Sequence, residues 1–346
     1  PVRQVRPRSS LMDPYKAAGV DVAAADEYVG TIADAVTASW GTNVVGGFGG
    51  FAAGLTIPSG YTNPILMMST DGVGTKLEIA RLMGDYSTVG TDLVAMCVDD
   101  LAAVGARAIG FTDYLAVGKL DPSRERTIVE SIASACAGIG CALLGGETAE
   151  HPGVVASNHV DLAGAALGIV EAGKQITGEA IQPGDQIIGI ASPNVRSNGF
   201  SLIRKIVDDL DELFPGSDRS IGSVLLEPSI IYTPAALALA DAGLAVGFAH
   251  VTGGGLPGNA GRPLPNGLSA RIDTGNWPRP PIFDWLAERG RIALEAMYGA
   301  FNMGIGFLIF ARPEVADRVF ETVSAFDLQA YGIGTIEENS ELVQLL

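Results

Sequence analysis

Three carboxylates and a lysine stand where a protein could hold a phosphate group. Asp71 follows an apolar run, Pro64–Ser69, and leads through two glycines to Lys76 at an expected helix start. The stretch is not a Walker A loop, because Thr75 separates Gly74 from Lys76 and the earlier glycine is missing. A carboxylate here could instead hold Mg²⁺, whose oxygen ligands bridge to phosphates. A solvated turn with an incidental lysine explains this stretch equally well.

The second carboxylate, Asp100, interrupts the apolar face of a helix predicted over residues 87–105. Cys97 and Val104 share that face at helical spacing. A carboxylate that faces a core is costly unless it is paired or binds a metal. A metal site is therefore favoured, and a helix cap or salt-bridge partner is the alternative. The neighbouring Asp99 is expected to be exposed.

The third carboxylate, Glu147, comes after a short predicted strand, Cys141–Leu144, and two glycines. Ligands of α/β proteins tend to bind at such strand ends. With Asp71 and Asp100, Glu147 would complete an acidic cluster for one or two Mg²⁺ ions. The uncharged loop GGFGGF, residues 46–51, could direct backbone N–H groups at a phosphate, although glycine runs also serve as plain linkers.

The second half of the chain carries two further candidate sites. Arg196, Ser197 and Asn198 stand at a predicted helix start, which suits an anion, although Ser197 as an ordinary N-cap fits equally well. The stretch AHVTGGGLPG, residues 249–258, formally matches a dinucleotide-binding fingerprint. Pro257 would break the long helix which that fingerprint requires, so a dehydrogenase is the weakest candidate.

The elements that must position these residues alternate between strands and helices, which predicts an α+β or α/β fold. The expected helices cover residues 14–40, 87–105, 122–138, 198–210, 229–242 and 313–325. The expected strands cover 64–69, 108–117, 141–144, 161–170, the stretch after the turn at 181–192, 244–250, 304–310 and 331–336. The apolar run 64–69 reads as a strand buried on both faces. We divide the chain into a flexible arm (1–12), an N-terminal domain (13–171) and a C-terminal α/β domain (172–346).

Composition narrows the possible partners and the compartment. The chain has 346 residues and a net charge of −17, which argues against nucleic acid or an anionic membrane as the main partner. Three cysteines without metal-type spacing fit reduced thiols, so a cytoplasmic location is expected. The uncharged stretch 41–70 is too broken by glycine and proline to span a membrane.

Eight stretches together resemble one family, the aminoimidazole ribonucleotide synthetases, which are phosphoribosylformylglycinamidine cyclo-ligases. They occur in the family's order and cover nearly the whole chain. They are YKAAGVD (15–21), GGFGGF (46–51), TDGVGTKL (70–77), GTDLVAMCVDDL (90–101), GGETAE (145–150), SNGFSLIRK (197–205), HVTGGG (250–255) and FNMGIG (301–306).

The resemblance implies a homodimer of two-domain subunits whose N-terminal domains pair in a shared barrel-like core. It implies a small-molecule substrate, formylglycinamidine ribonucleotide, with ATP and Mg²⁺ as cofactors. ATP would phosphorylate the amide oxygen, an internal nitrogen would attack, and phosphate would leave as the imidazole ring closes. The metal positions carry over onto Asp71, Asp100 and Glu147. The nucleotide positions are Gly46, Gly47, Phe48, Gly49, Gly50, Thr70, Asp71, Gly72, Lys76, Asp100 and Glu147, and the catalytic ones are Lys76, Arg196, Asn198 and His250.

The chain departs from the family pattern at three places. Arg196 stands where the family usually has histidine, and arginine cannot shuttle a proton, although it can steady an oxyanion. Ala296, Met297 and Ala300 replace the usual Glu-Met-x-x-Thr pattern, and Arg107 precedes Ala108 where Glu-Pro is usual. The alternatives are a kinase or synthetase of the same superfamily and a nucleotide-binding paralogue without turnover.

Overall fold

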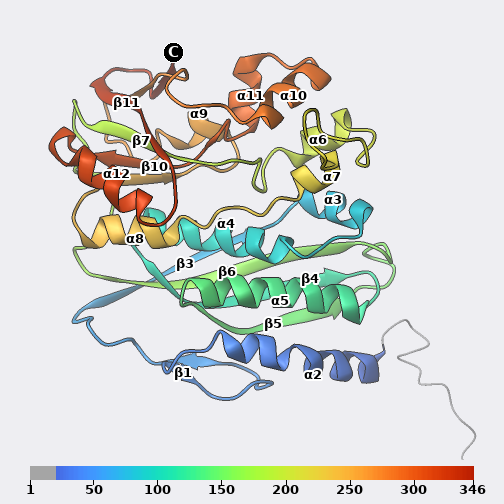
Figure 1. The fold of residues 1–346 in the computed structure, drawn as a ribbon. Helices are drawn as coiled ribbons and strands as arrows, with labels where there is room; N and C mark the ends of the chain where they lie inside the picture. Colours follow the sequence, from blue (N-terminus) through green and yellow to red (C-terminus); the bar gives the residue numbers. More distant parts are fainter. Residues whose placement is uncertain (1–20) are drawn as a thin grey trace, which may run out of the picture.

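The fold consists of two α+β halves, each built around its own sheet (Figure 1). A computed structural model describes residues 21–346. The predicted arm, residues 1–12, and the first residues of the helix predicted over 14–40 lie outside this range. Within it, no helix is long and apolar enough to cross a membrane.

The N-terminal half is a four-stranded sheet covered by helices. Its strand order is β3-β6-β4-β5, with the β4–β5 pair parallel and the other pairs antiparallel. Its elements are α2 (Val22–Ala38), the small hairpin β1 (Val44–Val45) and β2 (Gly54–Leu55), β3 (Pro64–Gly72), α3 (Lys76–Met83), α4 (Val89–Ala103), β4 (Arg107–Val117), α5 (Pro122–Gly138), β5 (Ala142–Glu150) and β6 (Val160–Glu171).

The C-terminal half is a six-stranded sheet in the order β12-β9-β11-β7-β10-β8, antiparallel except for the β12–β9 pair. Its strands are β7 (Gln186–Ala191), β8 (Gly247–His250), β9 (Leu268–Ile272), β10 (Ile305–Ala311), β11 (Ala330–Glu338) and β12 (Val343–Leu345). Its helices are α6 (Phe200–Ile206), α7 (Ile221–Leu225), α8 (Thr233–Asp241), α9 (Gly255–Asn259), α10 (Pro281–Gly290), α11 (Leu294–Ala300), the 3₁₀ turn η1 (Pro313–Val315) and α12 (Ala316–Ser324).

Helix α4 lies at the boundary between the two halves. It packs against β3, β6 and α5 on one side and against β8 and α8 on the other (Figure 1). Twelve of its fifteen residues are buried as a result. A helix covered on both sides must satisfy any polar side chain it carries from within the protein. The position of α4 therefore determines which partners its carboxylates can have.

Several predicted elements form because their local signals are strong. Asp121 caps α5 by accepting from the backbone N–H groups of Ser123 and Arg124, and Pro122 occupies the first helical turn. After α4, Gly105 adopts a left-handed φ of 76°, which ends the helix without the strain another residue would meet there. Each of these signals acts within a few residues, so the sequence alone could locate the start of α5 and the end of α4.

Three local predictions were wrong. Strand β3 is not buried on both faces, because Leu66 and Met68 are 56% and 76% exposed. Strand β5 continues to Glu150, so Glu147 lies within a strand and not after one. Helix α6 covers only Phe200–Ile206, since Val207 is already extended and the N-cap is Gly199, not Ser197.

Candidate active site

Two carboxylates on one face of α4 tie the N-terminal half to the C-terminal half. Asp92 and Asp99 are seven residues apart, which is two helical turns, and both are fully buried. The Asp92 carboxylate accepts hydrogen bonds from the backbone N–H and the hydroxyl of Ser229, at 2.9 and 2.6 Å. Asp99 Oδ1 accepts from the backbone N–H groups of Tyr232 and Thr233 and from the Thr233 hydroxyl. The segment before α8 is thereby anchored on α4.

Asp99 also holds Arg196, and this corrects the prediction that Asp99 is exposed. The Arg196 guanidinium is fully buried, with Nη2 3.2 Å from Asp99 Oδ2. Its Nη1 donates to the Ile230 carbonyl at 3.0 Å, and the guanidinium lies 4.7 Å from the centre of the Tyr232 ring. A buried charge needs such partners, because an unpaired ion in a protein interior is strongly destabilising.

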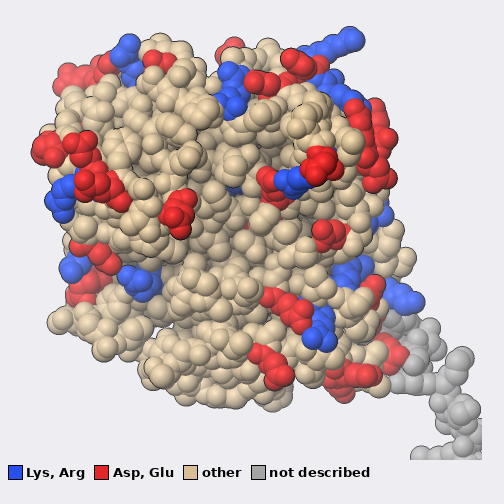
Figure 2. All heavy atoms as spheres, viewed as in Figure 1, with Lys and Arg blue, Asp and Glu red and all other residues tan. Residues whose placement is uncertain are grey.

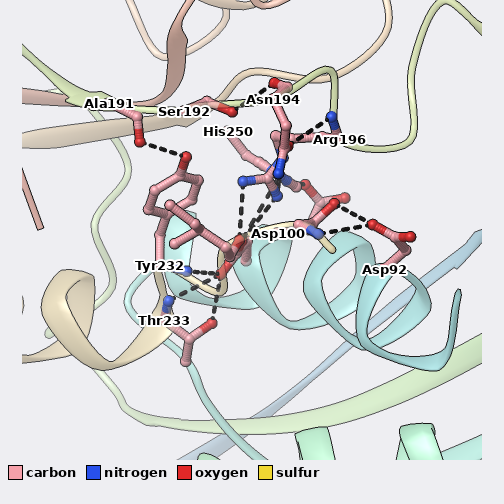
Figure 3. Close-up of polar contacts among 12 residues, drawn as sticks. Asp92, Asp100, Ala191, Ser192, Asn194, Arg196, Tyr232, Thr233 and His250 are labelled. Atoms are coloured by element: carbon pink, nitrogen blue, oxygen red, sulfur yellow. Dashed lines mark hydrogen bonds and ion pairs between the residues drawn. The ribbon is translucent and has the colours of Figure 1, made fainter. Parts of the chain in front are cut away.

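The backbone of Arg196 is unusual in the same place. Its φ is 58°, in the left-handed region that residues other than glycine seldom adopt. The side chain of Asn194 accepts from the Arg196 backbone N–H at 3.0 Å and so stabilises this turn. The turn directs the side chain into the boundary between the two halves (Figure 3).

A histidine joins Arg196 to the third carboxylate of α4, Asp100. Arg196 Nη2 lies 2.9 Å from His250 Nε2, and His250 Nδ1 lies 2.9 Å from Asp100 Oδ1 (Figure 3). The guanidinium is always a donor, so Nε2 must accept. The remaining proton of a neutral His250 is then on Nδ1 and is donated to Asp100. The geometry therefore assigns one tautomer of His250, which fixes the orientation of the Asp100 carboxylate.

Asp100 is the carboxylate that reaches solvent. Its side chain is 41% exposed and lines a cavity of about 720 Å³ between the two halves. Thr70, His250 and Arg262 line the same cavity. Asp71 is half-buried and lies close enough to Asp100 for the Asp100 charge to act on it. Burial raises the pKa of Asp71, the backbone N–H of Gly72 opposes that rise, and the Asp100 charge adds to it.

Asp71 and Asp100 have the chemistry of a Mg²⁺ site. Two neighbouring carboxylates that repel each other are stabilised by a divalent cation, and carboxylate oxygens are the ligands Mg²⁺ prefers. Mg²⁺ commonly uses one or two protein carboxylates and completes its shell with water and phosphate oxygens. Residues 21–346 contain no group of three or more His, Cys, Asp or Glu side chains placed to hold a metal.

Glu147 does not join this carboxylate pair within the chain. The strand register crosses the sheet from Glu147 on β5 to Tyr114 on β4, then to Ala163 on β6 and Gly72 on β3. Gly72 is next to Asp71 in the chain. Glu147 and Asp71 are thus on the two outer strands of the sheet, roughly 14 Å apart at the usual strand spacing. The predicted three-carboxylate cluster is therefore not assembled by one copy of the chain. Glu147 instead lines a second cavity together with residues 47–50 of the glycine loop.

Lys76 does not face either of these two cavities. Its side chain is fully buried, with Nζ 2.6 Å from Asp92 Oδ2 and 2.8 Å from the Glu227 carbonyl oxygen. Burial lowers the pKa of Lys76, while the Asp92 charge opposes that change. In this arrangement the ammonium group stabilises the boundary between the halves and is not available to a phosphate.

Of the candidate residues in the C-terminal half, only some line the large cavity. His250 lines the large cavity. Arg196 does not line it but contacts His250, and Asn198 lies against Gly253 in the glycine-rich stretch 249–258. Helix α6 has only seven residues, so the anion site predicted at its start has little support from a helix dipole. Helix α9, after the glycine cluster, has five residues, which agrees with rejecting a dinucleotide fold.

Three residues at these sites, Asp92, Asp113 and Arg262, were not predicted from the sequence, and Asp99 was predicted to be exposed. The seven-residue spacing of Asp92 and Asp99 was a usable signal, because it puts both on one helix face. Asp113 interrupts the inward-facing positions of β4, another readable signal. No local sequence pattern identifies Arg262, which lines the large cavity from a loop.

Comparisons with known proteins place this site in a family. Residues 52–170 match the AIR synthase related protein N-terminal domain, and residues 182–344 match its C-terminal domain. A phosphoribosylformylglycinamidine cyclo-ligase of Synechocystis sp. is 44% identical over 330 residues, 94% of this chain and 97% of the relative. One of Myxococcus xanthus is 43% identical and covers 93% of this chain and 95% of the relative.

Solved structures share the architecture at lower identity. Thiamine-monophosphate kinase from Stenotrophomonas maltophilia has a TM-score of 0.69 at 19% identity and covers 91% of this chain and 95% of its own. The hydrogenase maturation protein HypE in complex with ATP has a TM-score of 0.66 at 16% identity and covers 94% and 89%.

The two sheets and the two matching family models thus define a two-domain α+β protein of the AIR synthase-like superfamily. Within that class, the chain belongs to the phosphoribosylformylglycinamidine cyclo-ligase family, as its 44% identity over 94% of its length shows.

Proposed function

We propose that the chain is the ATP-dependent enzyme that converts formylglycinamidine ribonucleotide to aminoimidazole ribonucleotide, a ligase of purine biosynthesis. Family membership supports this activity, and the observation in the molecule that carries it is the Asp71–Asp100 pair, of which Asp100 lines the cavity between the two halves. The cavity, at about 720 Å³, is large enough for a nucleotide-sized ligand.

The reaction transfers the γ-phosphoryl group of ATP to the amide oxygen of the substrate. The ribose-bearing nitrogen then attacks the activated carbon, so a C–N bond forms, the C–O bond breaks, phosphate leaves and the nitrogen loses its proton. Positioning and charge neutralisation supply most of the catalysis in phosphoryl transfer. Mg²⁺, when bound, would neutralise phosphate charge at Asp71 and Asp100.

The surrounding residues have distinct roles in this proposal. His250 orients Asp100 through its Nδ1–H, and Arg196 holds His250 from behind. Arg262 offers a positive charge to a phosphate in a cavity otherwise lined by Asp100 and uncharged groups. The predicted phosphate contact of Lys76 is replaced by a supporting role, since its partner is Asp92.

We also propose that two copies pair through their four-stranded sheets. Leu66 and Met68 on β3 and Tyr114 on β4 are 56%, 76% and 44% exposed, an apolar surface unusual for an unpartnered sheet. Strands β3 and β5 are the two edge strands of this sheet in the described part of the chain. Closing two such sheets into one barrel would set the β5 edge of one copy beside the β3 edge of the other. Glu147 and the glycine loop would then approach the partner's Asp71–Asp100 pair.

Met68→Glu is expected to convert this dimer to a monomer, because a charge would have to be buried in the barrel. Light scattering coupled to size-exclusion chromatography measures the mass directly. Leu213→Glu, at a side chain 60% exposed on the C-terminal half, is the matched control and should leave the mass unchanged. A monomeric unsubstituted protein, or a Met68→Glu variant that stays dimeric, would contradict the proposed interface.

The domain boundary, the compartment and the kind of substrate complete the proposal. We place the domain boundary at residue 171, where β6 ends. The described cysteines are free and buried, which supports a reducing cytoplasm. On the face drawn in Figure 2, acidic and basic side chains are interspersed and no extended basic area is visible, in keeping with a small-molecule substrate.

The decisive experiment follows phosphate release and imidazole formation together, with ATP and Mg²⁺, in the presence and absence of formylglycinamidine ribonucleotide. Substrate-dependent release with one imidazole per phosphate is the expected result. Binding of ATP without release or product would overturn the proposal and favour a paralogue with another substrate.

A further inference from the structure

A third cavity lies in the C-terminal half, where β7 ends and β11 begins. Its volume is about 410 Å³, and within residues 21–346 it shares no lining residue with the two cavities described above. Ile230 lines it, and the Ile230 carbonyl accepts the hydrogen bond from Arg196 Nη1. A ligand in this cavity would therefore contact the segment that holds Arg196 without entering the large cavity.

The wall of this cavity is largely apolar and rigid. It is lined by Ile230 and Leu328 and by the prolines Pro193, Pro278, Pro280 and Pro281. Proline fixes its own backbone φ, so this wall is largely formed before any ligand binds. Trp277 Nε1 donates to the Met303 carbonyl at 2.9 Å and anchors the segment that carries three of these prolines. Such a wall suits the apolar body of a small molecule.

Arg279 brings an incompletely bonded guanidinium to this cavity. Its Nε is buried and hydrogen-bonds no described residue. A buried donor without an acceptor is unfavourable, and water, an ion or a ligand ordinarily supplies the acceptor. Among residues 21–346, its one ion-pair partner is Asp284, whose Oδ1 is 3.2 Å from Nη1. Because the Asp284 side chain is 59% exposed, this pair contributes little and leaves Arg279 able to bind a second acceptor.

Asp327 lines the same cavity with the opposite charge. Its carboxylate forms no hydrogen bond or ion pair with another residue of the described chain, and no further charged residue of that part lines the cavity. A simple anion would be attracted by Arg279 and repelled by Asp327, and a simple cation would meet the reverse. A molecule that carries both charges can form charge-assisted hydrogen bonds with both side chains.

We propose that this cavity binds a free α-amino acid with an apolar side chain. An α-amino acid joins a carboxylate, an ammonium group and a side chain at one carbon. The carboxylate would accept from the Arg279 guanidinium, the ammonium group would donate to Asp327, and the side chain would pack against the prolines. The assignment does not depend on the proposed function, because none of the residues placed in that reaction lines this cavity.

Calorimetric titration of the full-length protein with leucine and two analogues tests this proposal. Isocaproate is leucine without its amino group, and isoamylamine is leucine without its carboxylate, so all three share one apolar body. Leucine should bind roughly 10- to 100-fold more tightly than either analogue, the usual contribution of a charge-assisted hydrogen bond. Absence of leucine binding, or an analogue that binds as tightly as leucine, would overturn the proposal.

Asp327→Asn and Arg279→Gln each remove one charge and so locate the site. Both should weaken leucine binding roughly 10- to 100-fold. Asparagine tolerates the left-handed φ of 58° that Asp327 adopts, so the backbone should be kept. Asp317→Asn, at an exposed position of α12 outside the cavity, is the matched control and should bind leucine like the unsubstituted protein. Leucine binding that survives both substitutions would place the amino acid elsewhere and overturn the assignment.

Urea unfolding separates loss of the site from loss of the fold. Without leucine, Asp327→Asn should have the same midpoint as the unsubstituted protein, since its exposed carboxylate has no partner in the described chain. Saturating leucine should raise the midpoint of the unsubstituted protein and not that of Asp327→Asn, because a ligand that binds only the folded state stabilises it. An equal rise in both proteins would contradict the role of Asp327.

Discussion

Asp100→Asn is expected to reduce ATP turnover by more than the roughly 10- to 100-fold that loss of an outer-shell partner costs at a metal site. Asparagine can still accept the Nδ1–H of His250, so the orientation of the side chain is kept. What is removed is the negative charge that Mg²⁺ requires beside Asp71. The fold should be unaffected, because the Asp100 side chain is 41% exposed.

The measurement is phosphate release as a function of Mg²⁺ concentration. The variant should need much more Mg²⁺ and should reach a lower maximal rate. Asp208→Asn, at an exposed position outside the cavities discussed above, makes the same chemical change and should behave like the unsubstituted protein. Unchanged turnover at limiting Mg²⁺ would remove Asp100 from the metal site and leave the carboxylate pair without a function.

Asp99→Ala is expected to lower the free energy of unfolding by about 3–5 kcal/mol, the usual cost of leaving one member of a buried ion pair alone. Arg196 would keep its charge in a fully buried position with Asp99 Oδ2 gone. The backbone N–H groups of Tyr232 and Thr233 would also lose their acceptor. Urea unfolding followed by tryptophan fluorescence would measure the change.

Two further variants separate the charge from the hydrogen bonds. In the double variant Asp99→Ala with Arg196→Met, the unpaired charge is absent, so part of the stability should return. Glu130→Ala breaks the exposed Arg126–Glu130 pair and should cost no more than about 1 kcal/mol. If Asp99→Ala cost no more than Glu130→Ala, the buried pair would not be what holds the two halves together.

The Asp99–Arg196 pair also bears on the departure from the family pattern. Histidine is usual at the position of Arg196, and a permanently charged residue there cannot move protons. Because Arg196 is fully buried and contacts His250, it acts on the cavity only through His250 and Asp100. Arginine in this place is therefore compatible with activity, provided that no proton transfer passes through residue 196.

Much of the fold was predictable because it depends on short-range signals. The helix at Pro122–Gly138 was predicted with these bounds, and a capping aspartate and a proline in the first turn mark its start. Strands such as β4 and β6 were located to within one residue by their apolar runs. Predictions failed where burial depends on distant segments, as for the exposed face of β3, whose Leu66 and Met68 side chains are left exposed by the described residues of one copy.

The sequence by itself determined the family, the order of the elements and the set of residues from which a site could be built. It could not determine which of two adjacent aspartates faces the interior. Asp99 and Asp100 point about 100° apart around α4, and both directions contain protein in one half or the other. Only the tertiary structure placed Arg196, 97 positions along the chain, against Asp99 and left Asp100 at the cavity. The partner of a buried charge is set by long-range packing, and no local pattern encodes that packing.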